Sequence, residues 1–356
     1  MALKIKRKHT KSVKIGDVVI GAERPVAVQS MVKVSTANAK EVIKQINELE
    51  KAGCEIVRVA VKDARDAKAI AAIKRNINIP LVADIHFHYR LALEAIESGA
   101  DKIRLNPGNI FKKEEVKEIA MLAKARKMPI RIGSNSGSLR GNYLKIKDVG
   151  IALVRQTHDY IKTLEDFGVN NLVISLKSSD MFETINAYRK MSRLCGYPLH
   201  LGVTATGMFY DGIVKSSLGI GILLLEGIGD TVRVSLLGDP IDEVVVAKNI
   251  LSGLGVRKFG PKYICCPTCG RCEVDLRSKA KELISKLGNV NKDLSRTTVA
   301  LMGCMVNGPG EAKHADIGIA FGRGRGILFR KSKIVDTLKE ERCIDVLISQ
   351  LNGGLK

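Results

Sequence analysis

Hydrophobic positions recur at two different spacings along the first two thirds of the chain. Short runs rich in Val and Ile alternate with segments of helical periodicity, such as residues 39–53 and 114–127. Near-continuous apolar strands separated by helices are typical of a parallel sheet covered by helices. The apolar runs lie at residues 26–31, 55–61, 80–86, 101–107, 129–135, 171–177, 200–206 and 231–237.

These eight strand–helix units predict an α/β fold with a closed (β/α)₈ barrel of the TIM type. An open doubly wound sheet is the alternative, because periodicity alone does not establish closure. We assign residues 1–258 to the barrel, and the 356-residue chain leaves room for a second domain. Beyond residue 259 a helix at 275–288, a strand at 297–304 and a final helix at 334–351 predict a small α+β domain over 259–356.

Four of the predicted strands carry a single arginine between aliphatic neighbours: Arg58, Arg104, Arg131 and Arg233. Neighbouring side chains in a strand point to opposite faces, so aliphatic residues packed on the outer helices would turn each arginine inward. A buried guanidinium needs an anion nearby. One possibility is an internal salt-bridge network; the candidate carboxylates are Asp84, Glu226, Asp230 and Asp239.

The cations outnumber the carboxylates that we can assign to them, because Lys177 ends the sixth strand as well. This surplus favours a phosphorylated small-molecule ligand at the C-terminal mouth of the barrel. Further polar residues follow strands three, four and five, and Lys215 on the helix after strand seven suits either a phosphate contact or a solvated lysine. The predicted substrate-binding residues are Arg58, Asp84, Arg104, Asn106, Arg131, Asn135, Lys177, Lys215 and Arg233.

Charge and composition limit the classes of partner molecule that the protein is expected to bind. The chain holds 58 Lys and Arg against 37 Asp and Glu, a net charge of +21 that suits acidic proteins, phosphorylated substrates or nucleic acid. Nucleic-acid binding rests on charge alone, since aromatic residues make up 4% and Trp is absent. No apolar run reaches the roughly 20 residues of a membrane helix, and the basic N-terminus lacks an apolar signal core. We therefore expect a cytoplasmic protein without a membrane partner.

The stretch CCPTCGRC at residues 265–272 holds four of the eight cysteines. Cys266 and Cys269 have the spacing of two metal ligands in one turn, and an Asn-Gly-Pro-Gly turn after Cys304 can fold that thiol onto the same centre. A fourth ligand from Cys265 or Cys272 would give a closed zinc or electron-transfer site. Glu311 would instead give an exchangeable oxygen ligand on an open iron, and the spacing does not choose between them.

Two other classes of protein stay open at this point. One is a barrel with a zinc ribbon that binds nucleic acid or protein through its basic surface. The other is a sugar-phosphate barrel enzyme whose metal is purely structural.

The motifs CPTCGR at 266–271 and GCMVNGPGEA at 303–312 resemble the paired signature of the GcpE (IspG) family. Members of this family are iron–sulfur enzymes of non-mevalonate isoprenoid biosynthesis. The resemblance extends over nearly the whole chain, in the two-domain order of the bacterial form. Further matching stretches lie at residues 27–31, 82–87, 105–110, 131–139 and 224–236.

The resemblance implies an oxidoreductase with a [4Fe–4S] cluster held by Cys266, Cys269, Cys304 and Glu311, with Glu311 as the exchangeable, catalytic ligand. The implied reaction is the two-electron reductive ring opening of 2-C-methyl-D-erythritol 2,4-cyclodiphosphate, with loss of water, to 4-hydroxy-3-methylbut-2-enyl diphosphate. It further implies flavodoxin or ferredoxin as electron donor. It also implies a homodimer in which the cluster domain of one subunit caps the barrel of its partner. The other cysteines would be spare or buried thiols: Cys54, Cys195, Cys265, Cys272 and Cys343.

This chain departs from the family pattern at three strand ends. Residues 32–34 read Val-Lys-Val where the family has a polar Thr-Asn/Ser-Thr, and residues 204–207 read Thr-Ala-Thr-Gly where a Thr-Glu-Ala-Gly is expected. His88 replaces the usual Asp. All three positions lie on the predicted catalytic face, so they concern substrate contacts and not the fold or the cluster.

Overall fold

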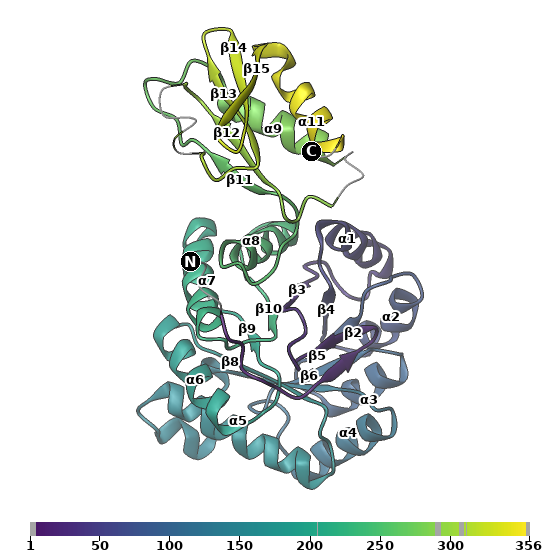
Figure 1. Cartoon of the computed structure of the whole chain (residues 1–356). Helices are drawn as coiled ribbons and strands as arrows, with labels where there is room; N and C mark the ends of the chain where they lie inside the picture. Colours follow the sequence, from purple (N-terminus) through teal and green to yellow (C-terminus); the bar gives the residue numbers. More distant parts are fainter. Residues whose placement is uncertain (1–4, 205, 289–292, 306–309, 311, 354–356) are drawn as a thin grey trace. The chain divides into compact units, whose positions relative to one another are not determined.

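The computed structural model describes residues 5–204, 206–288, 293–305, 310 and 312–353. By its internal contacts the chain divides into two compact units, Met1–Arg257 and Lys258–Lys356. Each unit is described by itself below, and Figure 1 gives the labels of its helices and strands.

The first unit is a closed barrel of eight parallel strands in the order β8-β7-β6-β5-β4-β3-β10-β9. The two edge strands meet through a parallel bridge between Ile174 and Leu199, and the Ile174 N–H donates to the Pro198 carbonyl at 2.9 Å. This closure confirms the predicted barrel over the open sheet. The strands are β3 (Ala27–Met31), β4 (Ile56–Val61), β5 (Leu81–Ile85), β6 (Lys102–Leu105), β7 (Ile130–Asn135), β8 (Leu172–Lys177), β9 (His200–Leu201) and β10 (Thr231–Val232).

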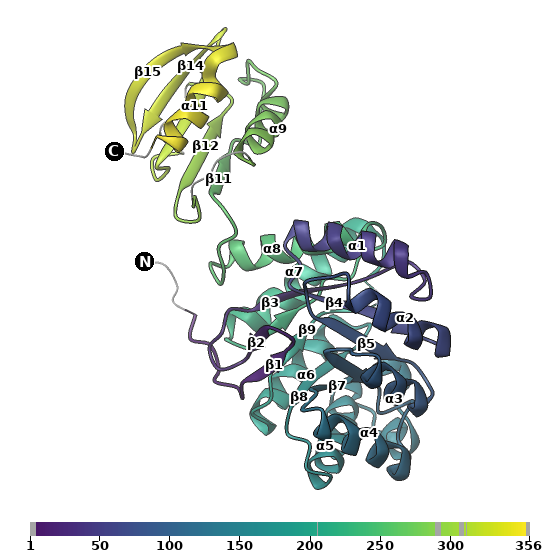
Figure 2. The same ribbon diagram turned by 90° about the vertical axis from the view of Figure 1, so that its right-hand side faces the viewer.

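Helices α1 to α8 cover the outside of the barrel, as Figures 1 and 2 show. Short polar side chains begin most of them: Asn38, Asp63, Asp148, Asp180 and Asp239 each accept a backbone N–H of the following turn. The helices are α1 (Ala39–Ala52), α2 (Ala64–Lys74), α3 (Tyr89–Glu97), α4 (Lys113–Ala125), α5 (Val149–Asp166), α6 (Met181–Leu194), α7 (Phe209–Leu225) and α8 (Pro240–Gly253), and two 3₁₀ turns, η1 (Ser136–Ser138) and η2 (Gly141–Lys145), lie between β7 and α5.

A β-hairpin that the sequence analysis did not predict precedes the barrel. Its strands, β1 (Val13–Ile15) and β2 (Val18–Ile20), pair antiparallel (Figure 2). The hairpin packs Val13, Ile15 and Ile20 against the first or second residues of four barrel strands. These residues are Ala27, Ile56, Val82 and Val173. The hairpin therefore closes the N-terminal end of the barrel with apolar side chains.

The second unit is a five-stranded sheet in sequence order, with β11, β12 and β13 parallel and β14 and β15 antiparallel. Helices α9 and α11 bury Leu283, Ile344 and Leu347 in one core together with residues of the sheet, such as Leu301 and Ile319. The strands are β11 (Lys262–Cys265), β12 (Thr298–Met302), β13 (Ile317–Gly322), β14 (Arg325–Arg330) and β15 (Lys333–Lys339), and the helical segments are α9 (Leu276–Leu287), η3 (Glu340–Arg342) and α11 (Cys343–Asn352).

The final predicted helix, residues 334–351, is wrong in its first half. Residues Lys333–Lys339 form β15, and the helix begins only at Cys343. Ile334, Val335 and Thr337 are β-branched and favour a strand. Because β15 is an exposed edge strand, it lacks the buried alternation that would have distinguished it from a helix.

We expect Ile20→Ala to lower the free energy of unfolding by about 2–5 kcal/mol, because it removes a fully buried side chain from the hairpin that closes the barrel. Urea denaturation followed by circular dichroism measures the change. Val18→Ala, at a partly buried position of the same hairpin, is the matched control and should cost less. Equal effects of the two substitutions would show that the hairpin does not seal the barrel.

Candidate active site

Four cationic side chains lie inside the barrel, one on each of four strands. Arg58 on β4, Arg104 on β6, Arg131 on β7 and Lys177 at the end of β8 are all at most 9% exposed. Arg104 pairs in register with Arg131. The inward orientation predicted from strand alternation agrees with this burial, because the aliphatic neighbours on both sides also pack away from solvent.

Asp84 on β5 is the carboxylate that joins two of these cations. Its Oδ1 lies 3.0 Å from Arg104 Nη1, and its Oδ2 lies 3.5 Å from Arg58 Nε. Burial alone would raise the pKa of Asp84, but Arg104, Arg58 and Arg131 outweigh it and lower the pKa to about 2. Asp84 is therefore ionised at neutral pH and fixes the positions of both arginines.

Two glycines leave space for the cationic side chains. Arg104 Nη2 donates to the Gly133 carbonyl at 2.7 Å, and a Cβ at residue 133 would collide with Arg104 Nε. A Cβ at Gly202 would lie 2.6 Å from Lys177 Nζ. With its amide oxygen turned toward Arg104, Asn135 accepts from Nη2 at 3.2 Å. The structure thus brings Asn135 into the arginine cluster.

Arg233 is held by Glu243, a carboxylate that the sequence analysis missed. Glu243 lies on α8, is 1% exposed, and accepts from Arg233 Nη2 at 3.1 Å through each of its oxygens. It also pairs with Lys33 at 3.2 Å and accepts from the Ser30 hydroxyl at 3.1 Å. Of the four partners proposed from the sequence, Asp84 lies on β5, Glu226 follows α7, Asp230 precedes β10 and Asp239 caps α8. Glu243 is inside a helix, where strand alternation gives no signal.

Arg131 has no carboxylate partner among the described residues, and its Nε and Nη1 are buried without a hydrogen bond. Burial and the neighbouring arginines lower its pKa, but a guanidinium starts from so high a value that it keeps its proton. Lys102, on the same face of β6 as Arg104, is also fully buried without a partner for Nζ. The interior therefore holds more cations than its two described carboxylates, Asp84 and Glu243, can balance.

Two of the predicted substrate-binding residues, Asn106 and Lys215, lie apart from the arginine cluster. Asn106 is 4% exposed, and its Oδ1 accepts from the Gly108 N–H at 3.0 Å and from the Ser138 hydroxyl at 3.1 Å, so it fastens two loops together. Lys215 lies exposed on α7, and no contact of the described structure links it to the arginine cluster.

The departures at residues 32–34 and 88 follow strands β3 and β5 and so lie at the mouth of the barrel, as expected from strand ends. Lys33 Nζ donates to the Leu236 carbonyl at 2.8 Å and to the Gly238 carbonyl at 2.6 Å, which ties the end of β3 to the loop before α8. His88 is exposed and precedes α3 without a side-chain cap. Ala205 lies outside the described residues.

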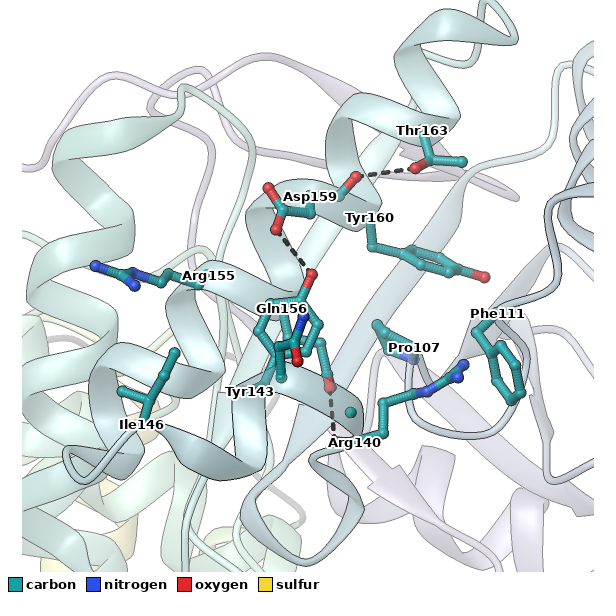
Figure 3. A pocket seen from close by; sticks show the side chains of 12 residues that line it. Pro107, Phe111, Arg140, Tyr143, Ile146, Arg155, Gln156, Asp159, Tyr160 and Thr163 are labelled. Carbon is teal, nitrogen blue, oxygen red and sulfur yellow. Dashed lines mark hydrogen bonds between the residues drawn. The ribbon is translucent and has the colours of Figure 1, made fainter.

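A separate cavity of about 630 Å³ lies between the loop after β7 and helix α5 (Figure 3). The Arg140 guanidinium lies over the Phe111 ring, and the Tyr143 hydroxyl donates to Asp159 at 2.8 Å. Gln156 Nε2 and the Tyr160 hydroxyl are buried there without a hydrogen bond. None of the predicted substrate-binding residues lines this cavity, so we treat it as distinct from the arginine cluster.

In the second unit, two neighbouring parallel strands carry the cysteines to one edge of the sheet. Cys265 pairs in register with Leu301, and the Cys266 N–H donates to the Leu301 carbonyl at 3.0 Å. Cys304 follows the end of the neighbouring strand β12. The Thr268 N–H donates to Cys266 Sγ at 3.3 Å, and such N–H···S bonds stabilise a thiolate ligand. Glu311 lies outside the described residues.

Among the described residues, no group of three or more His, Cys, Asp or Glu side chains is arranged to hold a single metal ion. The ligands of a cubane cluster bind different irons and so stand farther apart than those of one ion. Thiolates from one turn and one adjoining strand end are the donor type that iron–sulfur clusters use, so the residues present fit such a group. Cys272 is differently placed: its thiol donates to the Val274 carbonyl at 3.3 Å and packs against the core of this unit.

A closed parallel barrel with an excess of buried cations, followed by a small cysteine-bearing α+β unit, defines a class of two-domain barrel proteins with a cationic interior. The family models agree with this class over both units: one for the GcpE TIM-barrel domain matches residues 10–248, and one for the GcpE protein C-terminal domain matches residues 262–353. The chain belongs to the GcpE family.

Curated relatives match over nearly their whole length. A protein of Thermodesulfovibrio yellowstonii is 50% identical over 349 residues, which cover 98% of this chain and 99% of the relative. A protein of Caldicellulosiruptor saccharolyticus is 53% identical over 344 residues, covering 96% and 98%. Both carry the name 4-hydroxy-3-methylbut-2-en-1-yl diphosphate synthase (flavodoxin). Neither name describes a zinc-ribbon or nucleic-acid-binding protein, so the comparisons do not support that alternative.

Solved structures support the barrel fold alone. Dihydropteroate synthase of Yersinia pestis superposes with a TM-score of 0.52 at 13% identity, covering 70% of this chain and all of that one. The enzyme of Stenotrophomonas maltophilia gives a TM-score of 0.52, also at 13% identity, and covers 67% of this chain and 97% of that one. Within the part of the chain that the structure describes, no helix has the length and apolar character needed to cross a membrane.

We expect Asp84→Asn to destabilise the protein at pH 7 by about 3–5 kcal/mol, because it leaves Arg58 and Arg104 buried without their carboxylate. Because folding lowers the pKa of Asp84, this stabilisation is present at pH values above the unfolded-state pKa of about 4. It is lost as the pH falls toward 2. The gap between wild type and variant should therefore be constant from pH 8 to about 5 and narrow below about 4.

Urea unfolding at a series of pH values measures this gap. Glu115→Gln, which breaks the surface pair with Lys112, is the control and should cost less than about 1 kcal/mol at every pH. If Asp84→Asn costs no more than this control, Asp84 does not organise the arginines.

Proposed function

We propose that this protein is a 4-hydroxy-3-methylbut-2-enyl diphosphate synthase. It opens the ring of 2-C-methyl-D-erythritol 2,4-cyclodiphosphate by a two-electron reduction and releases water. The observation that carries this proposal is the identity of about half of all residues to enzymes of this name, along almost the whole chain. The cationic interior of the barrel independently suits a substrate with two phosphate groups.

The barrel residues bind and orient the substrate. Arg58, Arg104 and Arg131 present guanidinium groups that match phosphate oxygens in pairs, and Lys177 adds a fourth cation at the end of β8. Because Asp84 holds Arg58 and Arg104 in place beforehand, less side-chain freedom is lost when the substrate binds. Arg233 is already paired with Glu243, so we assign it to the wall of the mouth and not to the main phosphate contacts.

The second unit would hold a [4Fe–4S] cluster through Cys266, Cys269, Cys304 and Glu311. When bound, the cluster supplies electrons and an iron whose oxygen ligand can be exchanged for the substrate. The chain's part is to position the thiolates: the hydrogen-bonded pair β11–β12 brings Cys266 and Cys304 to one sheet edge, and the Thr268 N–H supports the Cys266 sulfur. Cys272 donates its own proton to a carbonyl and is assigned a packing role.

The electron donor that we propose is flavodoxin, which the names of the relatives include. Electron-transfer proteins of this kind are acidic, and a net charge of +21 would steer one toward the basic surface. The described cysteines form no disulfides, in keeping with a reducing, cytoplasmic location.

A homodimer is the assembly that we propose, and helix α7 offers a surface for it. Tyr210, Val214, Leu218 and Leu225 recur at helical spacing and are 47–79% exposed. Beside them a groove of about 340 Å³ runs between α7 and α8. An apolar stripe of this kind is unusual on a free surface and suits a second copy of the chain. In the proposed dimer the cluster domain of each subunit caps the barrel of the other.

Anaerobically purified protein should be brown, contain iron and sulfide, and convert the cyclodiphosphate when reduced flavodoxin is supplied. We expect Glu311→Gln to lower turnover by about 10²-fold or more, while cysteine-bound iron largely remains, because the exchangeable ligand is altered and the thiolates are not. Iron analysis, the visible spectrum and product formation are measured on the same samples.

Cys272→Ser is the matched control for the cluster ligands, because its thiol hydrogen-bonds to Val274 and should leave iron content unchanged. Cys304→Ser should instead bleach the protein without unfolding the barrel. A colourless protein that keeps zinc after iron–sulfur reconstitution, or near-normal turnover of Glu311→Gln, would count against the proposal.

We expect the double substitution Val214→Asp and Leu218→Asp to convert the dimer to a monomer, because it places charge in the centre of the apolar stripe on α7. Light scattering coupled to size exclusion measures the mass, and turnover should fall with dimer content. Met121→Asp, on the exposed face of α4, is the control for adding charge at an exposed apolar site. A wild-type monomer with full turnover would refute the dimer.

A further inference from the structure

Lys102 is a buried amine that the proposed reaction has not used. It begins β6, two residues before Arg104, so both side chains point into the barrel. Lys102 is completely buried, and its Nζ has no hydrogen-bond partner. A lysine ammonium carries three donors, and burying it without an acceptor or an anion is costly.

The charges that face Lys102 are positive. Arg131 on β7 and Arg58 on β4 both act on it, and no carboxylate among the described residues forms an ion pair with it. Asp84 is already engaged by two arginines, as Glu243 is by Arg233 and Lys33. Desolvation by burial, followed by Arg131 and Arg58, lowers the pKa of Lys102 well below its ordinary value.

Other polar atoms without partners lie in the same interior. Gln29 on β3 has both amide atoms buried and unpaired, and His200 on β9 has an unpaired Nε2. Burial and the fields of Arg131, Lys177 and Lys102 also lower the pKa of His200, which is therefore uncharged at neutral pH. These atoms offer hydrogen bonds to water and add no negative charge, so they do not supply Lys102 with a counterion.

We propose that Lys102 is the proton acceptor of the anion-binding barrel: it is an uncharged amine in the ligand-free protein and takes one proton from solvent when a diphosphate binds to the arginines above it. The inference rests on the proposed function for the identity of that diphosphate. Lys102 would be a positioning residue, since it acts through the charge of the arginine cluster in the barrel and does not touch the reacting atoms.

The physical reason is the change in sign of the local field. Before binding, Arg131 and Arg58 repel a further charge, and burial removes the water that would stabilise it. A bound diphosphate adds negative charge beside the same arginines, which raises the pKa of Lys102. Between the low pKa of the free protein and the higher pKa of the complex, binding takes up one proton, so affinity falls as pH rises through that interval.

Isothermal titration calorimetry in buffers of different ionisation enthalpy tests this proposal on the full-length protein. The cyclodiphosphate is the first ligand, because it has no group that titrates near neutral pH. We expect wild type to take up about one proton more per bound ligand than Lys102→Met, and its affinity to fall about tenfold more per pH unit. Lys117→Met, at an exposed position of α4, should behave as wild type.

Inorganic pyrophosphate, compared between the same proteins so that its own titration cancels, separates the two proposals. If pyrophosphate binds with the Lys102-dependent uptake and the cyclodiphosphate does not bind, the proposed function fails and the inference stands. Wild type that binds the cyclodiphosphate without net uptake, or equal uptake in wild type and Lys102→Met with either ligand, overturns the inference, as does failure of both ligands to bind. Lys102→Gln provides the same comparison if the methionine variant does not fold.

Discussion

The closed barrel confines more positive charge than it contains negative charge, and the rest of the first unit depends on this imbalance. Asp84 and Glu243 are the two inner carboxylates of the described structure, and each already contacts two cations. Arg131 therefore remains charged, buried and without an ion pair. A fold that keeps such a side chain away from water is stable only at a cost, and an incoming anion removes that cost. The affinity that we propose for a phosphorylated ligand would thus come in part from the free energy that the fold spends on burying Arg131.

The register of the strands determines which charged side chains of the barrel lie next to one another. Register pairing places Asp84, Arg104 and Arg131 side by side on three successive strands. The missing side chain at Gly133 gives Arg104 room to reach its carbonyl. At the mouth, Lys33 donates to the Leu236 carbonyl and pairs with Glu243, which ties the end of β3 to α8 and to the loop before it.

The barrel and its arginines were predictable because period-two alternation determines which side chains point inward. The same alternation applies to Lys102, but a lysine at the start of a strand also fits a solvated end, so the sequence pattern did not single it out. Glu243 was missed because its partner lies on another element, and only the fold brings α8 against β3. The hairpin Val13–Ile20 and strand β15 were missed because short or exposed strands carry little periodic signal. Cysteine spacing predicted Cys266 and Cys269 as candidate metal ligands, but it did not predict the strand pair β11–β12 that brings Cys266 and Cys304 to one edge of the sheet.

The pairing of β11 with β12 bears on how the enzyme would respond to loss of its proposed cluster. The candidate cluster thiols of the second unit stand at the ends of strands whose sheet packs an apolar core of its own with α9 and α11. Small zinc domains lack such a core and fold only around their metal. The core of this unit would hold its strands together without the proposed cluster, so a cluster lost to oxygen would be rebuilt in place without refolding of the chain.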